Sequence, residues 1–176
     1  LYGGVEMTRY LYGASVQGIQ DFIFETNKLK EIVGASEIVE QLCDREKFCE
    51  KLEIEEDSVD FILAAAGNIR LVAEKGTLEK IVLNWPKIVA EIAPGVTLSQ
   101  AVVECENPTK NTMDELEKKL KIQRNKASMP NELAPMAAIR SRRTGKPAVD
   151  WEDEKNPRDF GTKAKQNAGH ENAPDS

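Results

Sequence analysis

Histidine and cysteine are scarce in this sequence of 176 residues, which contains one histidine and three cysteines. Cys43, Cys49 and Cys105 lack the close pairing that zinc ligands show, and His170 stands alone in a polar stretch. We therefore expect no metal site, no disulfide framework and no catalytic set of the Ser-His-Asp or Cys-His kind. Thiols without partners are typical of a reducing compartment, so a cytoplasmic protein is expected.

Long apolar runs are also missing. No stretch approaches the roughly 18 apolar residues that a membrane-spanning helix requires, and no P-loop or dinucleotide-binding glycine motif occurs. The 40% of hydrophobic residues still allows one substantial core. We expect a single domain over residues 7–127, followed by a basic linker and polar C-terminal segment over residues 128–176.

Positive charge is concentrated in one segment. The chain has 24 basic and 30 acidic residues, a formal net charge of −6. Residues 118–146 hold nine Lys or Arg and one acid, Glu132, a net charge of +8, which leaves 15 basic and 29 acidic residues, or −14, for the remainder. A basic segment on an acidic body can be a docking surface, either for nucleic acid or for an acidic face of another protein. The alternative is a helix face exposed to solvent, followed by a loop.

The first third of the chain reads as a strand followed by a long helix. Residues 8–16 carry apolar side chains on both faces, which is typical of a central strand. From Ile19 to Leu42 apolar residues recur at three- and four-residue steps, which predicts an amphipathic helix. The small residues Gly34-Ala35-Ser36 predict a kink or break in it. Residues 44–58 are rich in acids and are expected to form a loop.

The middle of the chain predicts a hairpin and a second helix. Residues 60–66 and 69–74 read as two strands joined by a tight turn at Gly67-Asn68. The helix is expected to start after Thr77, to kink at Pro86 and to stop at Pro94-Gly95.

The remaining elements complete a β-α-β-β-α-β order. Residues 96–104 predict a strand, and residues 112–127 predict an extra, more polar helix with Thr112 as its cap. The fold class is therefore α+β, a ferredoxin-like sheet with two helices on one face, a further helix and a polar tail. Beyond Trp151 the chain has little to bury, so we expect it to be loosely ordered or to dock on something outside this chain.

Three features stand together between residues 19 and 36: Ile19-Gln20 before Phe22-Ile23, basic residues from Lys28 to Lys30, and Gly34-Ala35-Ser36. This order resembles the palm domain of the large, polymerase-like subunit of type III CRISPR effector complexes. The hairpin sequence AAAGNIRLV resembles that family's hairpin, and the run RSRRTGKPAV resembles the linker after its palm. The resemblance covers residues 8–149 and implies a CRISPR-associated protein of antiviral defence.

The departures from that family concern its chemistry. Active palms carry Gly-Gly-Asp-Asp at the hairpin, where this chain has Gly67-Asn68. Two-metal phosphoryl transfer needs acidic side chains that hold Mg²⁺ beside the triphosphate. Asp21 follows one helical turn after the first strand, and Asp60 lies about 20 Å from the hairpin tip at ~3.3 Å per residue. The zinc-binding cysteines of the family's linker are absent as well. The resemblance therefore implies the inactive partner of an active palm, with no catalytic residue.

Two groups of residues are candidates for binding. The nucleotide-facing candidates are Gly67, Asn68, Gly34 and Ser36, whose alternative roles are a tight turn and helix packing. The nucleic-acid candidates are Arg140, Arg142, Arg143 and Lys146, because arginine binds phosphate through two hydrogen bonds; the alternative is a disordered basic linker. We expect any affinity for RNA to reside in residues 118–146.

Three functions remain open. The first is a non-catalytic palm-like module that binds nucleotide or RNA, or pairs with another palm domain or with CRISPR-type effector subunits. The second is a nucleotidyl cyclase or cyclic-oligonucleotide polymerase that uses Mg²⁺ and ATP, with its acids outside this chain. The third is an RNA-binding domain of the RNA-recognition-motif type, which the sequence favours least, because residues 60–74 contain one aromatic residue, Phe61.

Overall fold

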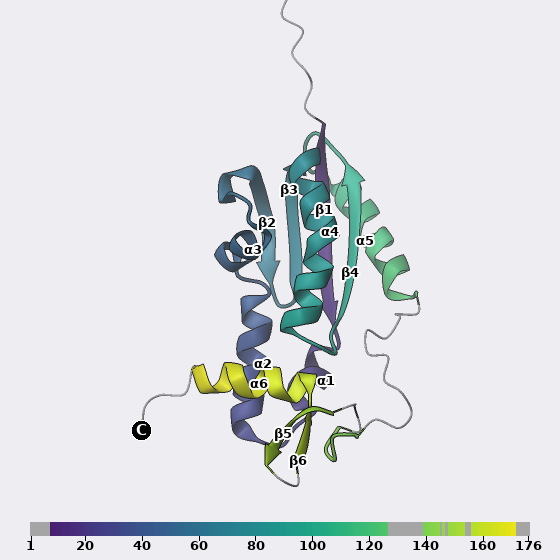
Figure 1. Ribbon diagram of the computed structural model, residues 1–176. Helices are drawn as coiled ribbons and strands as arrows, with labels where there is room; N and C mark the ends of the chain where they lie inside the picture. Colours follow the sequence, from purple (N-terminus) through teal and green to yellow (C-terminus); the bar gives the residue numbers. More distant parts are fainter. Residues whose placement is uncertain (1–7, 127–138, 145, 147, 154–155, 172–176) are drawn as a thin grey trace, which may run out of the picture.

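A computed structural model of the chain describes residues 8–126, 139–144, 146, 148–153 and 156–171 (Figure 1). Its main sheet has four antiparallel strands in the spatial order β2-β3-β1-β4. The strands are β1 (Arg9–Gln17), β2 (Val59–Ala65), β3 (Asn68–Glu74) and β4 (Thr97–Glu104). Helices follow β1 and β3, which is the ferredoxin-like arrangement, so the predicted α+β fold class is confirmed.

Helices cover both faces of this sheet. They are α1 (Ile19–Phe24), α2 (Leu29–Gln41), α3 (Arg45–Leu52), α4 (Lys75–Ile92) and α5 (Lys110–Arg124), with a 3₁₀ turn at Glu56–Ser58. On one face, the main core is centred on the fully buried Tyr12, Phe48 and Trp85 from β1, α3 and α4. On the other face, Leu116 and Leu120 of α5 cover the central strands. No helix in the described ranges is long and apolar enough to span a bilayer.

The C-terminal segment is folded against the rest of the chain. Two short strands, β5 (Ala148–Asp153) and β6 (Asn156–Asp159), form a hairpin that leads into α6 (Phe160–Glu171). Helix α6 crosses α2 below the main sheet (Figure 1). The prediction that the chain beyond Trp151 is loosely ordered or docks outside the chain is therefore wrong for residues 152–153 and 156–171.

Two glycines explain why α6 and α2 pack so closely. A Cβ atom at Gly34 would overlap the carbonyl oxygen of Lys165, and one at Gly169 would overlap that of Lys30. The helix backbones are therefore in direct contact, which only glycine permits at these two positions. Gly34 and Gly169 are 135 residues apart, and neither segment has a sequence pattern that would predict their contact.

The predicted long helix is interrupted before Gly34, not at it. Helix α1 ends at Phe24, and α2 runs without a break through Gly34-Ala35-Ser36 to Gln41. The interruption lies at Thr26, whose hydroxyl accepts a hydrogen bond from the N–H of Lys28 (3.2 Å) and donates one to Glu31. A threonine side chain that binds nearby backbone in this way competes with the helical hydrogen bonds.

Residues 44–58, expected to form a loop, contain helix α3 instead. The side chain of Asp44 accepts a hydrogen bond from the N–H of Lys47 (2.9 Å) and so caps the helix. Phe48 and Leu52, four residues apart, are buried in the main core. The helix has few apolar residues among many charged ones, so its apolar spacing was too short to predict a helix from the sequence.

The hairpin turn lies one residue earlier than predicted. Ala66 and Gly67 form it, both with positive φ (50° and 77°), as a two-residue hairpin turn requires. Asn68 is already the first residue of β3.

Two helix starts also differ from the prediction. Helix α4 begins at Lys75, before the expected cap Thr77, and continues through Pro86. Helix α5 is capped by Thr109, and Thr112 completes the capping box from its third position.

Pro86 is tolerated inside α4 because a strand residue replaces the hydrogen bond it removes. Proline lacks an N–H, so the carbonyl four residues earlier, that of Val82, loses its helical partner. The side-chain amide of Gln100 in β4 donates to this carbonyl (3.0 Å). The oxygen of the same amide accepts from the hydroxyl of Tyr12 (3.0 Å), whose pKa burial raises well above its usual range. Gln100 thus satisfies two polar groups between β4, β1 and α4.

This bridge predicts coupling between Gln100 and Pro86. Gln100→Met should lower the free energy of unfolding by about 2–4 kcal/mol, because two largely buried polar groups lose their partner. In a Pro86→Ala background the loss should be about 1 kcal/mol smaller, since the alanine N–H then binds Val82. Urea unfolding of the four proteins measures the cycle, and strictly additive losses would contradict the bridge.

The helix crossing predicts opposite effects of two glycine replacements. Gly34→Ala should destabilise the chain by about 1–3 kcal/mol through overpacking. It should also speed amide hydrogen exchange in α6. Gly76→Ala is the matched control, because no atom lies within 4 Å of the added Cβ in α4. That change should stabilise by about 0.5–1 kcal/mol. Equal, mild effects at both positions would show that α6 is not held at Gly34.

Candidate functional site

The tip of the β2–β3 hairpin is fixed by packing against its neighbours. The N–H of Gly67 donates to the sulfur of Cys43 (3.0 Å), and its carbonyl accepts from the N–H of Val16 (2.7 Å). A Cβ at Gly67 would lie 2.5 Å from the Cδ1 of Ile19. Burial raises the pKa of the Cys43 thiol, which favours its neutral form. Gly67 is therefore required for the positive φ of the turn and for the close contact with Ile19.

Asn68, at the start of β3, joins the end of β1 through a chain of side chains. The hydroxyl of Ser15 donates to the side-chain oxygen of Asn68 (3.0 Å), and the Nη2 of Arg124 donates to that hydroxyl (3.0 Å). The amide nitrogen of Asn68 donates to the carbonyl of Ala66 (3.1 Å). An exposed guanidinium thus stands beside the hairpin tip.

The position of Arg124 follows from how α5 is held on the sheet. The buried guanidinium of Arg70 in β3 pairs with Glu117 of α5 (2.6 Å) and donates to the carbonyl of Ala14 (2.8 Å). Gly13 lets Leu116 approach β1, because a Cβ there would lie 2.8 Å from that side chain. These contacts set the direction of α5. The sequence placed a basic helix here but carried no signal that its last residue reaches β1.

Acidic side chains are not gathered at the tip. Asp60 pairs with Arg9 at the opposite end of β2, and Asp21 is exposed on α1. Within the described residues no group of three His, Cys, Asp or Glu side chains could hold a metal ion. The described tip therefore offers an amide, a hydroxyl and a guanidinium, which are groups suited to hydrogen bonds with phosphate, and it has none of the paired carboxylates that two Mg²⁺ ions require.

The other two nucleotide-facing candidates lie apart from this chain of contacts. Gly34 is buried under α6, so its backbone faces Lys165 and has no room for a nucleotide. Ser36 is exposed on α2. Of the four candidates, the structure therefore places Gly67 and Asn68 together and leaves Gly34 within the protein's own packing.

The nucleic-acid candidates include cations that are bound by acids of this chain. Arg143 pairs with Glu31 (2.8 Å) and Glu152 (3.0 Å), and Lys146 pairs with Glu25 (2.8 Å). Arg140 and Arg142 are exposed in the same stretch. Residues 127–138, the middle of the basic segment, lie outside the described residues. Arg143 and Lys146 thus link the linker to α1 and α2.

Glu31 is the centre of this network. Its side chain is 1% exposed, and it accepts hydrogen bonds from Thr26, Arg143 (2.8 Å) and Gln166 of α6 (2.7 Å). Burial alone raises the pKa of this carboxyl, but the three hydrogen bonds and the Arg143 charge outweigh burial and hold the pKa below its usual value. The ionised carboxylate therefore stabilises the junction of α2, α6 and the linker.

Comparisons with known proteins support the fold. No protein-family model matches the sequence, and no curated protein matches it. Solved structures do match: a chain of a Csm1–Csm4 cassette with pppApApA aligns with a TM-score of 0.52 and 19% identity, and one with AMPPNP with 0.51 and 18%. Each alignment covers 68% of this chain and 19% of that chain.

A Csm1–Csm4 subcomplex from the type III-A CRISPR–Csm interference complex aligns at 0.49 and 20% identity, with the same coverage. The structural neighbours are thus chains of Csm1–Csm4 complexes. At such identities the likeness shows the fold, and this chain spans about a fifth of the length of those chains.

The depressed pKa of Glu31 predicts a loss of stability in acid. A lowered folded pKa means that the carboxylate stabilises the fold above its unfolded pKa of about 4.5 and that this contribution is lost as the pH falls through the folded value. At pH 7 the Glu31→Gln variant should therefore be less stable than the unchanged chain. Between pH 5 and pH 3, a window that follows from this linkage, it should lose less stability than the unchanged chain, because it lacks the carboxylate that becomes protonated. Urea unfolding at several pH values measures both effects.

Some acid dependence should remain in that variant, because hydrogen bonds from Thr162 and Thr144 outweigh burial and hold the pKa of Asp159 low as well. Glu50→Gln, an exposed change on α3, is the matched control and should leave the profile unaltered. If Glu31→Gln and Glu50→Gln gave the same profile, the network would not depend on the Glu31 charge.

Proposed function

We propose that this chain is a non-catalytic palm-like module of a CRISPR-type antiviral defence protein. Residues 7–127 form the palm-like unit, and residues 128–176 follow it. The ferredoxin-like fold, its likeness to chains of Csm1–Csm4 cassettes and the Ile19–Ser36 resemblance support this proposal. The observation that carries it is the composition of the described hairpin tip, where Asn68, Ser15 and Arg124 stand without a carboxylate.

In this proposal the module binds the phosphates of a nucleotide and pairs with a catalytically complete palm. Both polar atoms of the Asn68 amide are engaged within the chain, so they are not free to replace a pair of metal-binding acids. Arg124 is exposed and adds positive charge at this edge. A cation positioned beside a triphosphate stabilises its charge without performing chemistry, while the partner palm supplies the metals.

The alternative of an RNA-recognition motif has less support from the described sheet. That motif stacks bases on the open face of its central strands. Here the central strands β1 and β3 are covered by α4 on one face and by α5 on the other, with Leu11 and Val72 buried under α5. The alternative of an enzyme requires acids from outside this chain.

The proposal predicts that the purified chain releases no pyrophosphate from ATP with Mg²⁺ or Mn²⁺. The reason is that the described tip carries no acidic ligand for either metal. A coupled pyrophosphate assay measures this. Metal-dependent release that Asp21→Asn or Asp60→Asn abolishes would overturn the proposal, because those acids would then serve as ligands.

Binding of ATP is expected to depend on Arg124. Arg124→Ser should weaken ATP binding, measured by calorimetry in low salt, by about tenfold, the cost of one charged hydrogen bond to phosphate. Lys121→Ser removes the same charge from an exposed position on the same helix and is the matched control. Equal losses in the two variants would indicate general electrostatic attraction instead of a phosphate site at the tip.

A further inference from the structure

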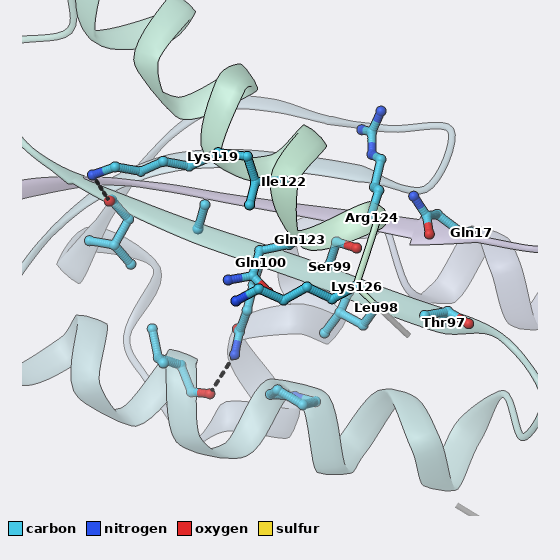
Figure 2. Close-up of a pocket in the computed structure, with 14 residues that line it drawn as sticks. Gln17, Thr97, Leu98, Ser99, Gln100, Lys119, Ile122, Gln123, Arg124 and Lys126 are labelled. Atoms are coloured by element: carbon cyan, nitrogen blue, oxygen red, sulfur yellow. Dashed lines mark hydrogen bonds between the residues drawn. The ribbon is translucent and has the colours of Figure 1, made fainter. Parts of the chain in front are cut away.

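A groove runs along the outer edge of β4, between α4 and α5 (Figure 2). It has a volume of about 790 Å³. Its floor is the strand itself, from Thr97 to Val102. One wall is formed by Val82 and Pro86 of α4, and the other by the last turns of α5 and the residues after it. None of the nucleotide-facing candidates lines this groove.

The floor of the groove presents backbone groups that pair with no strand among the described residues. Among the described strands β4 pairs with β1 alone. The N–H of Cys105 donates to the carbonyl of Arg9 (3.0 Å), which fixes the alternation of the ladder. Every second residue of an antiparallel strand directs its N–H and C=O to the neighbour, and the residues between direct theirs outward. In the part of β4 that forms the floor, the outward groups are therefore those of Leu98, Gln100 and Val102.

One of these outward groups is already bound. The ammonium group of Lys119 in α5 donates to the carbonyl of Val102 (3.1 Å), as Figure 2 shows. A lysine at a strand edge hinders unspecific pairing with other chains. This contact lies at one end of the groove, and the backbone groups of Leu98 and Gln100 remain toward the other end.

The lining has a charge that contrasts with the whole chain. It contains three cations, Lys119, Arg124 and Lys126, and no Asp or Glu, although the chain has a net charge of −6; Lys119 is paired with Glu115 (3.0 Å), which lies outside the lining. It also has apolar surface, which includes Leu98 and the half-exposed Ile122. Positive charge, apolar contacts and an open strand edge therefore meet in one groove.

We propose that this groove binds an extended, acidic polypeptide segment, which adds to the edge of β4 as a fifth strand. Strand addition uses backbone hydrogen bonds for affinity and alternate side chains for specificity. Acidic side chains of the segment face Lys119 and Lys126 on the α5 side, and the apolar side chains between them contact Leu98 on the α4 side. The inference does not depend on the hairpin tip or on nucleotide binding.

Single-stranded RNA accounts for fewer of these features. It is bound by cations along its backbone together with aromatic side chains that stack on its bases. The lining has the cations but no aromatic residue. An RNA ligand would also not form the strand-type hydrogen bonds that the outward backbone groups of Leu98 and Gln100 offer. The polypeptide uses the edge, the apolar surface and the charge together.

The test compares three fluorescent probes on the full chain in low salt. They are an eight-residue peptide of alternating Glu and Val, the same peptide with Lys in place of Glu, and a twelve-nucleotide oligouridine. The acidic peptide should bind, and the basic peptide should not. Oligouridine that binds more tightly than the acidic peptide would overturn the proposal in favour of a nucleic-acid groove.

Charge reversal locates the site. Lys119→Glu with Lys126→Glu should weaken binding of the acidic peptide by at least about tenfold, since two attractive charges become repulsive. Lys118→Glu with Lys121→Glu changes the net charge by the same amount on exposed positions of α5 outside the lining. That control should weaken binding by less than about threefold, as screened long-range attraction predicts. Equal losses in the two variants would contradict a specific groove.

Amide exchange tests the strand addition itself. The bound acidic peptide should protect the N–H groups of Leu98 and Gln100 from hydrogen exchange, because these groups become paired. The N–H of Ser99 already belongs to the β1 ladder and serves as the internal control. Binding without added protection at Leu98 and Gln100 would overturn the pairing mode even if the charge reversals behave as expected.

Discussion

The pairing of β1 with β3 is the interaction on which the rest of this structure depends. It aligns Ser15 with Asn68 and ends where Val16 donates to the carbonyl of Gly67 (2.7 Å). That register brings the hairpin tip to the end of β1. It also sets the buried Arg70 under α5, and so directs Arg124 to the same place. A shift of the β1–β3 register by one residue would turn every side chain of one strand to the opposite face. Ser15, Asn68 and Arg124 would then no longer lie together.

The sequence predicted this part of the fold well because its signals are local. Alternating and continuous apolar runs identified the four strands of the sheet, and the small residues near Gly67 identified the hairpin. The order of strands and helices then left few topologies, of which the ferredoxin-like one is the observed fold. The absence of an acid at the tip was also visible directly, since it depends on which residues occupy a turn.

What the sequence did not reveal depends on contacts between distant residues. The docking of α6 depends on Gly34 and Gly169. The residues around each glycine do not show whether it is needed for close packing or only for a flexible backbone. The buried Glu31 reads as an ordinary surface acid until Arg143 and Gln166 are placed beside it. Arg143 and Lys146 were read as free to bind nucleic acid, but each is paired within the chain. Charge counted along a sequence does not show which cations are already neutralised.

Exposed positive charge also lies on α5 and just after it, at Lys118, Lys121, Arg124 and Lys126. The sheet thus offers two adjoining surfaces that share Arg124, the hairpin tip and the groove along the edge of β4. Both surfaces are proposed to bind anions, and within the described residues neither has the acids of a metal site, which is consistent with a module that supports the chemistry of another domain.

The most direct test of that account is whether a divalent metal binds at the hairpin tip. Mn²⁺ broadens the NMR signals of nearby amides, so it can be added to the isotopically labelled chain without nucleotide, which would itself carry the metal. The account predicts that the signals of Ser15, Gly67 and Asn68 broaden no more than those of exposed acidic loops. Selective broadening of these three amides at equimolar Mn²⁺ would show a metal site and contradict the account.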